Sequence, residues 1–277
     1  MKICYVSDFF LSDLIGGGEL NDHELCSILS KQVKINKIRC RELTINKVQQ
    51  YTHFIISNFI SLSPYVKDYI TKNCNYVIYE HDHKYLKNRN PSVFKDFRAP
   101  SEAIINESFY RSAKAVFCQS SFHENIISLN LDNVTLVNVS GNLWSTDSLS
   151  IMKTLCNKEK REWFSILNSK TEHKNTSGSL LYCDAKNYKS ELISSQNYQE
   201  FLSLLSNNNS FVFLPKTPET LSRVVVECRM MNMRTVINKN VGASYEPWFQ
   251  MKGNELIDFM ESKRRLIPDL VIRELQK

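Results

Sequence analysis

Glycine and proline are scarce in this chain, which has seven of each in 277 residues. No G-x-G-x-x-G stretch occurs, so the sequence gives little support to a classical dinucleotide-binding fold. The eight cysteines are scattered and form no C-x-x-C pair. This pattern is typical of reduced cysteines in the core of an intracellular protein, and it argues against a disulfide framework.

Long hydrophobic runs are also missing. No stretch approaches the length that a membrane-spanning helix needs, and the first ten residues lack the apolar core of a signal sequence. We therefore expect a soluble, cytoplasmic protein without a membrane span. The richness in Asn, Lys, Ile and Ser is typical of an AT-rich genome such as a phage's, in which case the protein would work in the host cytoplasm.

Short apolar runs alternate with helical or polar segments along most of the chain. A strand that follows a helix that follows a strand predicts a parallel sheet, and therefore an α/β fold. The predicted strands cover residues 2–7, 54–57, 76–79, 115–118, 136–139, 179–183, 211–214 and 235–237.

The length suits two Rossmann-like halves. We expect an N-terminal Rossmann-like domain over residues 1–145 and a C-terminal Rossmann-like domain over residues 160–255. The polar stretch 145–162 is the best linker candidate. Residues 256–277 are expected to form a helix.

Two glutamates bracket seven residues just after the predicted strand 211–214. Glu219 follows the strand, and Glu227 lies in the helix that comes next. In an open α/β sheet this order places both carboxylates near the crevice where ligands bind, where they can accept hydrogen bonds from sugar hydroxyls. The alternative is two surface glutamates that fall at this spacing by chance.

The helix start beside these glutamates is a candidate phosphate site, because the first N–H groups of a helix lack acceptors within it. The residues concerned are Leu221, Ser222 and Arg223. Asn232 at the end of the helix is expected to adopt the left-handed conformation that glycine usually takes at a helix C-terminus.

Together with residues 232–237 and 241–246, this stretch resembles the glycosyltransferase family 4 branch of the GT-B superfamily. The family pattern is a strand, E-x7-E, a helix, G-x-P-V-I and v-G-G-x-x-E. Three positions depart from it: Asn232 and Ala243 replace glycines, and Arg234 replaces a proline. The resemblance implies two Rossmann-like domains whose parallel sheets face a central cleft. In the family the N-terminal domain lies on the acceptor side, the C-terminal domain binds the nucleotide sugar, and the last helix packs back on the N-terminal domain, so we expect residues 256–277 to do the same. The resemblance also implies retaining transfer of a sugar from a nucleotide diphosphate sugar, with Glu219 on the donor sugar and Glu227 on the ribose.

A glycine block near the N-terminus fits the same family. Gly16, Gly17, Gly18 and Glu19 match the G-G-x-E loop whose following helix faces the donor diphosphate. Glycine is needed where the backbone turns tightly or approaches a ligand closely. A flexible surface loop is the alternative.

His81 follows the predicted strand 76–79, where the family often carries a histidine that reaches the donor sugar. A purely structural histidine is the alternative. His81 and His83 form an H-x-H pair, but no third and fourth ligand follows at a metal-binding spacing, so we expect no metal. Ser120 or Ser121 is expected to contact substrate or to cap the next helix.

The family places an arginine and a lysine after the first strand of its second domain. With residues 179–183 as that strand, Lys186 and Lys189 are the predicted ligands of the diphosphate. With residues 163–167 as the strand, the ligands become Lys170 and Lys174.

Cations and aromatic residues cluster in residues 84–98 of this chain of net charge +6. The cations are Lys84, Lys87, Arg89, Lys95 and Arg98, and the aromatic residues are Tyr85, Phe94 and Phe97. Cations neutralise phosphates and aromatic faces stack on exposed bases, so the cluster predicts a polyanionic acceptor. Arg39, Arg41 and residues 263–265 are expected to extend it.

The best hypothesis is transfer from a UDP-sugar to a 5-hydroxymethylated pyrimidine in phage duplex DNA, with the target base flipped out. No cofactor is required, because the nucleotide diphosphate sugar is a co-substrate. A carbohydrate, lipid-linked or protein acceptor is one alternative. A non-catalytic GT-B binding module is another.

Overall fold

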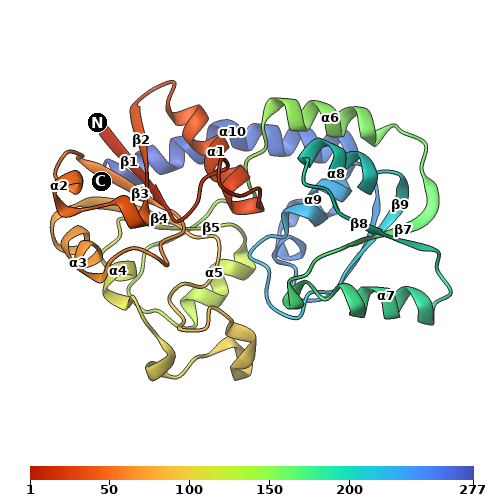
Figure 1. Cartoon of the computed structure of the whole chain (residues 1–277), viewed down its shortest axis with the longest axis horizontal. Helices are drawn as coiled ribbons and strands as arrows, with labels where there is room; N and C mark the ends of the chain where they lie inside the picture. The colour runs from red at the N-terminus through yellow and green to blue at the C-terminus, as the bar shows by residue number, and fades with distance from the viewer. The chain divides into compact units, whose positions relative to one another are not determined.

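The structure is a computed structural model that describes all residues, 1–277 (Figure 1). The chain forms two compact units. Unit 1 comprises Met1–Leu143 and Lys263–Lys277, and unit 2 comprises Trp144–Ser262. Each unit is built around one parallel sheet.

Unit 1 alternates strands and helices along the chain. Its strands are β1 (Lys2–Ser7), β2 (Lys34–Arg39), β3 (His53–Ile56), β4 (Asn75–Tyr79), β5 (Val116–Cys118) and β6 (Leu136–Asn138). Its helices are α1 (Gly17–Leu29), α2 (Ile45–Val48), α3 (Pro64–Asn73), α4 (Glu107–Arg111) and α5 (Ser121–Ser128). The sheet has the order β2-β1-β3-β4-β5-β6.

Both faces of this sheet are buried, which explains why its central strands are almost entirely apolar. Successive side chains of a strand point to opposite faces. Cys4 and Val6 of β1 therefore pack in one core together with Val66 of α3. Ile3 and Tyr5 pack in the other, which α1 covers (Figure 1).

The last helix, α10 (Gly253–Leu275), contributes to both units. Its first turns belong to unit 2, and its second half packs in the unit 1 core through Ile267, Val271 and Leu275. Polar contacts add to this packing: the Lys263 ammonium donates to the Val139 carbonyl at 3.0 Å, and the Arg264 guanidinium pairs with Glu24 at 2.6 Å.

Unit 2 has a smaller sheet in the order β10-β9-β7-β8. The strands are β7 (Arg161–Leu167), β8 (Ser190–Ile193), β9 (Asn208–Phe213) and β10 (Arg234–Ile237). The helices are α6 (Thr146–Cys156), α7 (Thr176–Ala185), α8 (Tyr198–Leu205) and α9 (Arg223–Met230). Phe211 and Phe213 pack under α6, α8 and α9, whereas Phe164 and Val212 pack under α7.

The α/β class and the parallel strands are confirmed. The left-handed conformation of Asn232 is also confirmed, with φ of 61°. Strands β2 and β8 were not predicted, because each lies at a sheet edge where polar residues interrupt the apolar pattern. None of the helices has the length and apolar character needed to cross a lipid bilayer.

The linker expected over residues 145–162 is wrong. Residues 146–156 form α6, and Ser145 caps the helix by accepting from the Ser148 N–H. Leu149 and Met152 are buried in the unit 2 core. The segment looks polar because the exposed face of this amphipathic helix carries Thr146, Asp147, Ser150, Lys153 and Thr154.

The packing of α10 in the unit 1 core predicts how shortening a side chain in the second half of this helix affects stability. Ile267→Ala should lower the free energy of unfolding by about 2–5 kcal/mol, because Ile267 is fully buried. Leu266→Ala is the matched control, because Leu266 is 44% exposed and should cost far less. Urea unfolding followed by circular dichroism measures the difference, and equal losses for the two variants would contradict the packing.

Candidate functional site

In unit 2, the loops that follow β7 and β9 meet at one edge of the sheet. The two strands are parallel neighbours, so their carboxyl ends lie together. The loop after β9 is fixed by the backbone: Glu219 forms a parallel bridge with Val241, its N–H donating to the Asn240 carbonyl at 2.7 Å. Glu219 is thereby held at the carboxyl edge of the sheet.

A lysine from the loop after β7 faces this glutamate. The Lys174 ammonium lies 2.9 Å from both carboxylate oxygens of Glu219. The side chains are 29% and 13% exposed, so the pair is largely shielded but accessible from one side. One cation and one carboxylate thus stand side by side at the end of the sheet.

The prediction that residues 179–183 form a strand is wrong, because they lie inside α7. A short apolar run has no periodicity of its own, so it fits a strand and a helix equally well. Lys186 and Lys189, whose selection depended on that strand, are both exposed. Lys189 immediately precedes β8 and therefore lies at the opposite, amino end of the sheet. The first strand of unit 2 is β7, which makes Lys174 the cation that the structure brings to Glu219.

Glu227 in α9 is 2% exposed and sits in a polar cluster inside unit 2. Its Oε1 accepts from the Trp144 indole at 2.9 Å, the Tyr198 hydroxyl at 2.6 Å and the Arg223 guanidinium at 3.0 Å. Burial raises the pKa of Glu227 despite the opposing effect of Arg223. All three bonds reach the same oxygen, so Oε2 keeps its acceptor capacity.

The start of α9 has an unusual residue. Ser222 precedes the helix with φ of 71°, a left-handed conformation that is uncommon outside glycine, and its side chain makes no capping bond. Its hydroxyl is buried without a hydrogen-bond partner. Leu221 is buried in the apolar core, so only its backbone faces the site. The Ser222 hydroxyl is therefore an unsatisfied polar group at this helix start.

In unit 1, the glycine block forms the beginning of α1. Gly16 is the residue before the helix, and Gly17 and Gly18 form its first turn. A Cβ at Gly18 would lie 3.4 Å from Cγ of His81, so glycine lets the histidine ring approach the helix closely. Glu19 is 8% exposed, and burial raises the pKa of its carboxyl group.

His81, placed directly after β4, is held by hydrogen bonds at both ring nitrogens. Nε2 lies 2.6 Å from Oδ1 of Asp22, and Nδ1 lies 2.8 Å from the side-chain nitrogen of Gln119. Ser57 donates to the other carboxylate oxygen of Asp22. Asp22 and Gln119 have no motif that would single them out in the sequence. Ser120 caps α5, since its hydroxyl accepts from the His123 N–H at 3.2 Å.

Lys84 is not available to an acceptor, which corrects the prediction. It is 2% exposed and pairs with Glu80, which is fully buried. Glu80 also accepts from the Tyr110 hydroxyl and from the Asp82 N–H. A buried ammonium needs such a partner, because an unpaired buried charge is costly. The pair fixes the start of the segment that follows β4.

The aromatic residues of this segment also turn inward. Tyr85 is fully buried, Phe94 packs against the unit 1 core, and Phe97 meets Phe122 edge to face at 5.8 Å. The aromatic stacking platform expected from the sequence is therefore wrong. Four cations remain on the surface: Lys87, Arg89, Lys95 and Arg98. Arg89 pairs with Asp82 at 3.1 Å.

The expected extensions of the basic patch are largely neutralised. Arg39 pairs with Asp13 and Glu42, and Lys263 and Arg264 hold α10 in unit 1. Only Arg41 and Arg265 remain exposed among these predicted positions.

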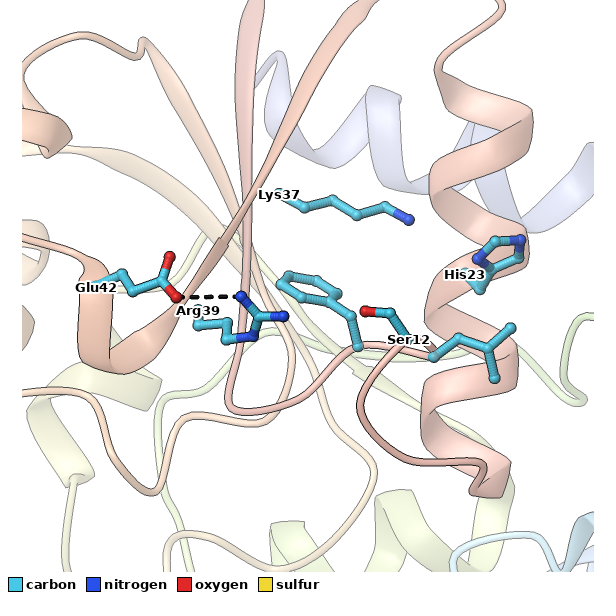
Figure 2. A pocket seen from close by; sticks show the side chains of 7 residues that line it. Ser12, His23, Lys37, Arg39 and Glu42 are labelled. Carbon is cyan, nitrogen blue, oxygen red and sulfur yellow. Dashed lines mark hydrogen bonds and ion pairs between the residues drawn. The ribbon is translucent and has the colours of Figure 1, made fainter. Parts of the chain in front are cut away.

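A pocket of about 550 Å³ lies in unit 1 near the carboxyl ends of β1 and β2 (Figure 2). Its lining residues are Phe10, Leu11, Ser12, His23, Lys37, Arg39 and Glu42. Figure 2 shows Lys37 extended from β2, with Arg39 bonded to Glu42. The Lys37 ammonium lies 5.8 Å from the Phe10 ring centroid and has no carboxylate partner. The pocket thus has an apolar wall and one uncompensated cation.

No protein-family model and no curated protein sequence matches this chain. Solved structures do match. The HepE protein of Anabaena, in complex with UDP and glucose, is 12% identical with a TM-score of 0.57, covering 98% of this chain and 90% of its own. Sucrose-phosphate synthase of Thermosynechococcus elongatus is 9% identical with a TM-score of 0.62, covering 100% and 92%. The lipopolysaccharide outer core galactosyltransferase WaaB is 11% identical with a TM-score of 0.52, covering 98% and 91%.

The chain has the GT-B fold. At these identities the similarity concerns the fold alone. In this GT-B chain, Glu219 and the first turn of α9 lie at the carboxyl edge of the unit 2 sheet, and His81 and the first turn of α1 lie at the corresponding edge of the unit 1 sheet. Among the predicted cations, the structure brings to Glu219 not Lys186 or Lys189 but Lys174, which the sequence offered as the alternative.

Two buried histidines in unit 1 of the GT-B chain predict a dependence of stability on pH. Burial, aided by Lys84, lowers the pKa of His83 to about 3, and burial beside His83 also lowers that of His123. Their rings meet edge to face at 5.2 Å. Both stay neutral in the folded chain below the ordinary histidine pKa of about 6.5, whereas the unfolded chain takes up protons there. Stability should therefore fall as the pH drops from about 6.5 towards 4.

His83→Phe tests this expectation, because it keeps an aromatic ring at this buried position and removes one titrating group. The stability of this variant should fall less steeply over the same pH range. His173→Gln, at an exposed position, should keep the slope of the wild-type chain. Urea unfolding at a series of pH values gives the slopes, and parallel curves for His83→Phe and wild type would show that His83 does not contribute.

Proposed function

We propose that this protein is a retaining glycosyltransferase that moves a sugar from a nucleotide diphosphate sugar, with UDP favoured, to a hydroxyl group of an acceptor. The observation that carries the proposal is the Lys174–Glu219 pair beside the start of α9. It combines a cation and the N-terminus of a helix for a diphosphate with a carboxylate for sugar hydroxyls. Support comes from the similar HepE fold, which was solved with UDP and glucose.

Each part of the donor has a binding group in this proposal. Lys174 and the N–H groups at the start of α9 hold the diphosphate, and the unpartnered Ser222 hydroxyl adds a donor there. Glu219 accepts from hydroxyls of the sugar. Glu227 binds a ribose hydroxyl through Oε2, since its Oε1 already accepts three hydrogen bonds.

In the reaction, the bond between the anomeric carbon and the diphosphate oxygen breaks, and the acceptor oxygen bonds to that carbon from the same side. The acceptor proton passes to the departing phosphate oxygen. Negative charge grows on the diphosphate, so the Lys174 ammonium and the α9 N-terminus lower the barrier by stabilising it. Glu219 holds the sugar while the anomeric carbon gains oxocarbenium character.

The proposal extends to the acceptor. Its narrower form is that the acceptor is a hydroxymethylated base in duplex DNA. The exposed cations Lys87, Arg89, Lys95 and Arg98 favour a polyanion, because each can neutralise a backbone phosphate. The inward-facing aromatic residues remove the stacking argument, so the cations alone support DNA. A carbohydrate, lipid-linked or protein acceptor is the broader form.

A substrate panel tests the proposal. UDP-, GDP- and ADP-sugars are each incubated with plain DNA, hydroxymethylcytosine DNA or no acceptor, and nucleotide release and product mass are recorded. A gain of one sugar on modified DNA alone would support the narrower form, and the anomeric configuration of the product would test retention. Nucleotide release without DNA modification would reject DNA and keep a glycosyltransferase. Binding without turnover of any donor would indicate a non-catalytic module.

Lys174→Ala should lower kcat/KM for donor turnover by about 10²- to 10³-fold, the usual cost of removing one donor that stabilises developing charge. Lys216→Ala is the matched control, because Lys216 forms a similar 2.9 Å pair with Glu172 but is 49% exposed. Steady-state kinetics of nucleotide release compares them. Similar losses in both variants, or none in Lys174→Ala, would contradict the role of Lys174.

Glu227→Gln should raise the KM for the donor about tenfold and change kcat little, since a weakened ribose contact is worth about 1.4 kcal/mol. The glutamine is preferable to alanine, which would leave Trp144, Tyr198 and Arg223 without their buried acceptor. Circular dichroism provides the folding control. A fall in kcat with unchanged KM would place Glu227 at the reacting sugar instead.

A further inference from the structure

A chain of buried side chains in unit 1 ends on His81, and the orientation of each amide in it is fixed by the backbone. Asn142 accepts the Leu143 N–H through Oδ1 at 2.9 Å, so its nitrogen is the atom that donates to Oε1 of Gln119 at 2.9 Å. The Gln119 nitrogen donates to the Glu80 carbonyl at 3.2 Å. Reversing the Gln119 amide would break both of its bonds.

The fixed amide determines which nitrogen of His81 carries the proton. The Gln119 nitrogen donates, so Nδ1 of His81, 2.8 Å away, accepts and is unprotonated. The proton therefore lies on Nε2 and is donated to Asp22 at 2.6 Å. A proton on Nδ1 would point at the NH₂ group of Gln119, which favours the Nε2–H tautomer.

Asp22 is built to remain a carboxylate in this position. It is 1% exposed, and one oxygen accepts from His81 while the other accepts from Ser57. Burial by itself would raise the pKa of Asp22, but the contacts with His81 and Ser57 hold it below its ordinary value. The Asp22 carboxylate therefore gives the Nε2–H group of His81 an acceptor in a fixed position.

The ring is also fixed by packing. Cγ of His81 would lie 3.4 Å from a Cβ at Gly18, and the ring centroid lies 5.3 Å from that of Tyr79. Gly18 belongs to the first turn of α1, which the glycine block leaves open. A rotation of the His81 ring would therefore change its contact with Gly18 in the first turn of α1.

We infer that Asp22 is a positioning residue for His81: together with Gln119 it fixes the Nε2–H tautomer and the orientation of the His81 ring beside Gly18. This inference rests on the proposed function, because His81 matters for transfer only if the donor sugar binds there. His81 then acts through its position, with both ring nitrogens already bonded. General acid or base catalysis by its imidazole is not part of this inference.

The tautomer can be measured without any activity. In the full chain labelled with ¹⁵N-histidine, long-range ¹H–¹⁵N correlation spectra distinguish a protonated Nε2 from a protonated Nδ1, and a His81→Gln variant assigns the signal among the six histidines. The wild-type chain should show the Nε2–H form of His81. Asp22→Asn should give a mixture of tautomers, because the new amide can present either its oxygen or its NH₂ group. An Nδ1–H form in the wild-type chain would overturn the inference.

Kinetics tests the consequence for transfer. Asp22→Asn should lower kcat for UDP-sugar turnover by up to about 10²-fold, the typical cost of a small misplacement, and change the donor KM much less. In a His81→Ala background the same substitution should add no further loss, because Asp22 acts through the ring. Asp68→Asn, which removes an exposed carboxylate paired with Lys72, should match wild type.

The two proposals fail in different ways. If the wild-type chain turns over no nucleotide sugar, the proposed function fails, and the tautomer measurement still decides whether Asp22 and Gln119 fix His81. If the wild-type chain is active and Asp22→Asn keeps full kcat, or if its loss is equally large without His81, the positioning role fails while the glycosyltransferase stands.

Discussion

Parallel strand pairing is the constraint on which the rest of this structure depends. A parallel strand can be followed by another only if the chain returns across a face of the sheet, usually as a helix. Both faces of each sheet are therefore covered, and all strands of a sheet end at the same edge. Glu219, Lys174 and His81 lie in loops at such edges. Within unit 2, Lys174 and Glu219 come together there although they lie 45 residues apart in the sequence.

Placing polar groups at the edge of an apolar core creates a second requirement, which is to compensate every buried charge. Three carboxylates show how the chain meets it. Glu80 accepts from Lys84 and Tyr110, Asp22 from His81 and Ser57, and Glu227 from Trp144, Tyr198 and Arg223. Only Glu227 retains an oxygen without a partner. Glu227 therefore has an oxygen that can still accept a hydrogen bond, whereas both oxygens of Glu80 and of Asp22 already accept one.

The sequence predicted the fold class and most central strands, because buried parallel strands are short, apolar and separated by helices. It also placed Glu219 in the loop after a strand and Glu227 in the following helix, as the structure has them. It failed where the pattern is ambiguous. Residues 179–183 are apolar for the length of a strand but belong to α7. Taking them for a strand favoured Lys186 and Lys189 as the diphosphate ligands over Lys174, the lysine that the structure brings to Glu219. It also failed for Lys84 and Tyr85, since a charged or aromatic residue in a loop carries no sign of its burial. The contacts of Asp22 and Gln119 with His81 could not be predicted from the sequence, because only the folded structure brings these residues together.

The edge strands have a consequence for how the chain behaves at high concentration. An exposed sheet edge presents unpaired N–H and C=O groups on which another chain can add a strand. The edge strand β6 has only three residues, and β8 and β10 have four each. The longer edge strand β2 has six residues, with Lys34, Lys37 and Arg39 among them. If β2 of a second copy paired with this edge, these cations would lie close to their counterparts and repel them. The polar residues that interrupt the apolar pattern of β2 therefore discourage aggregation through that edge.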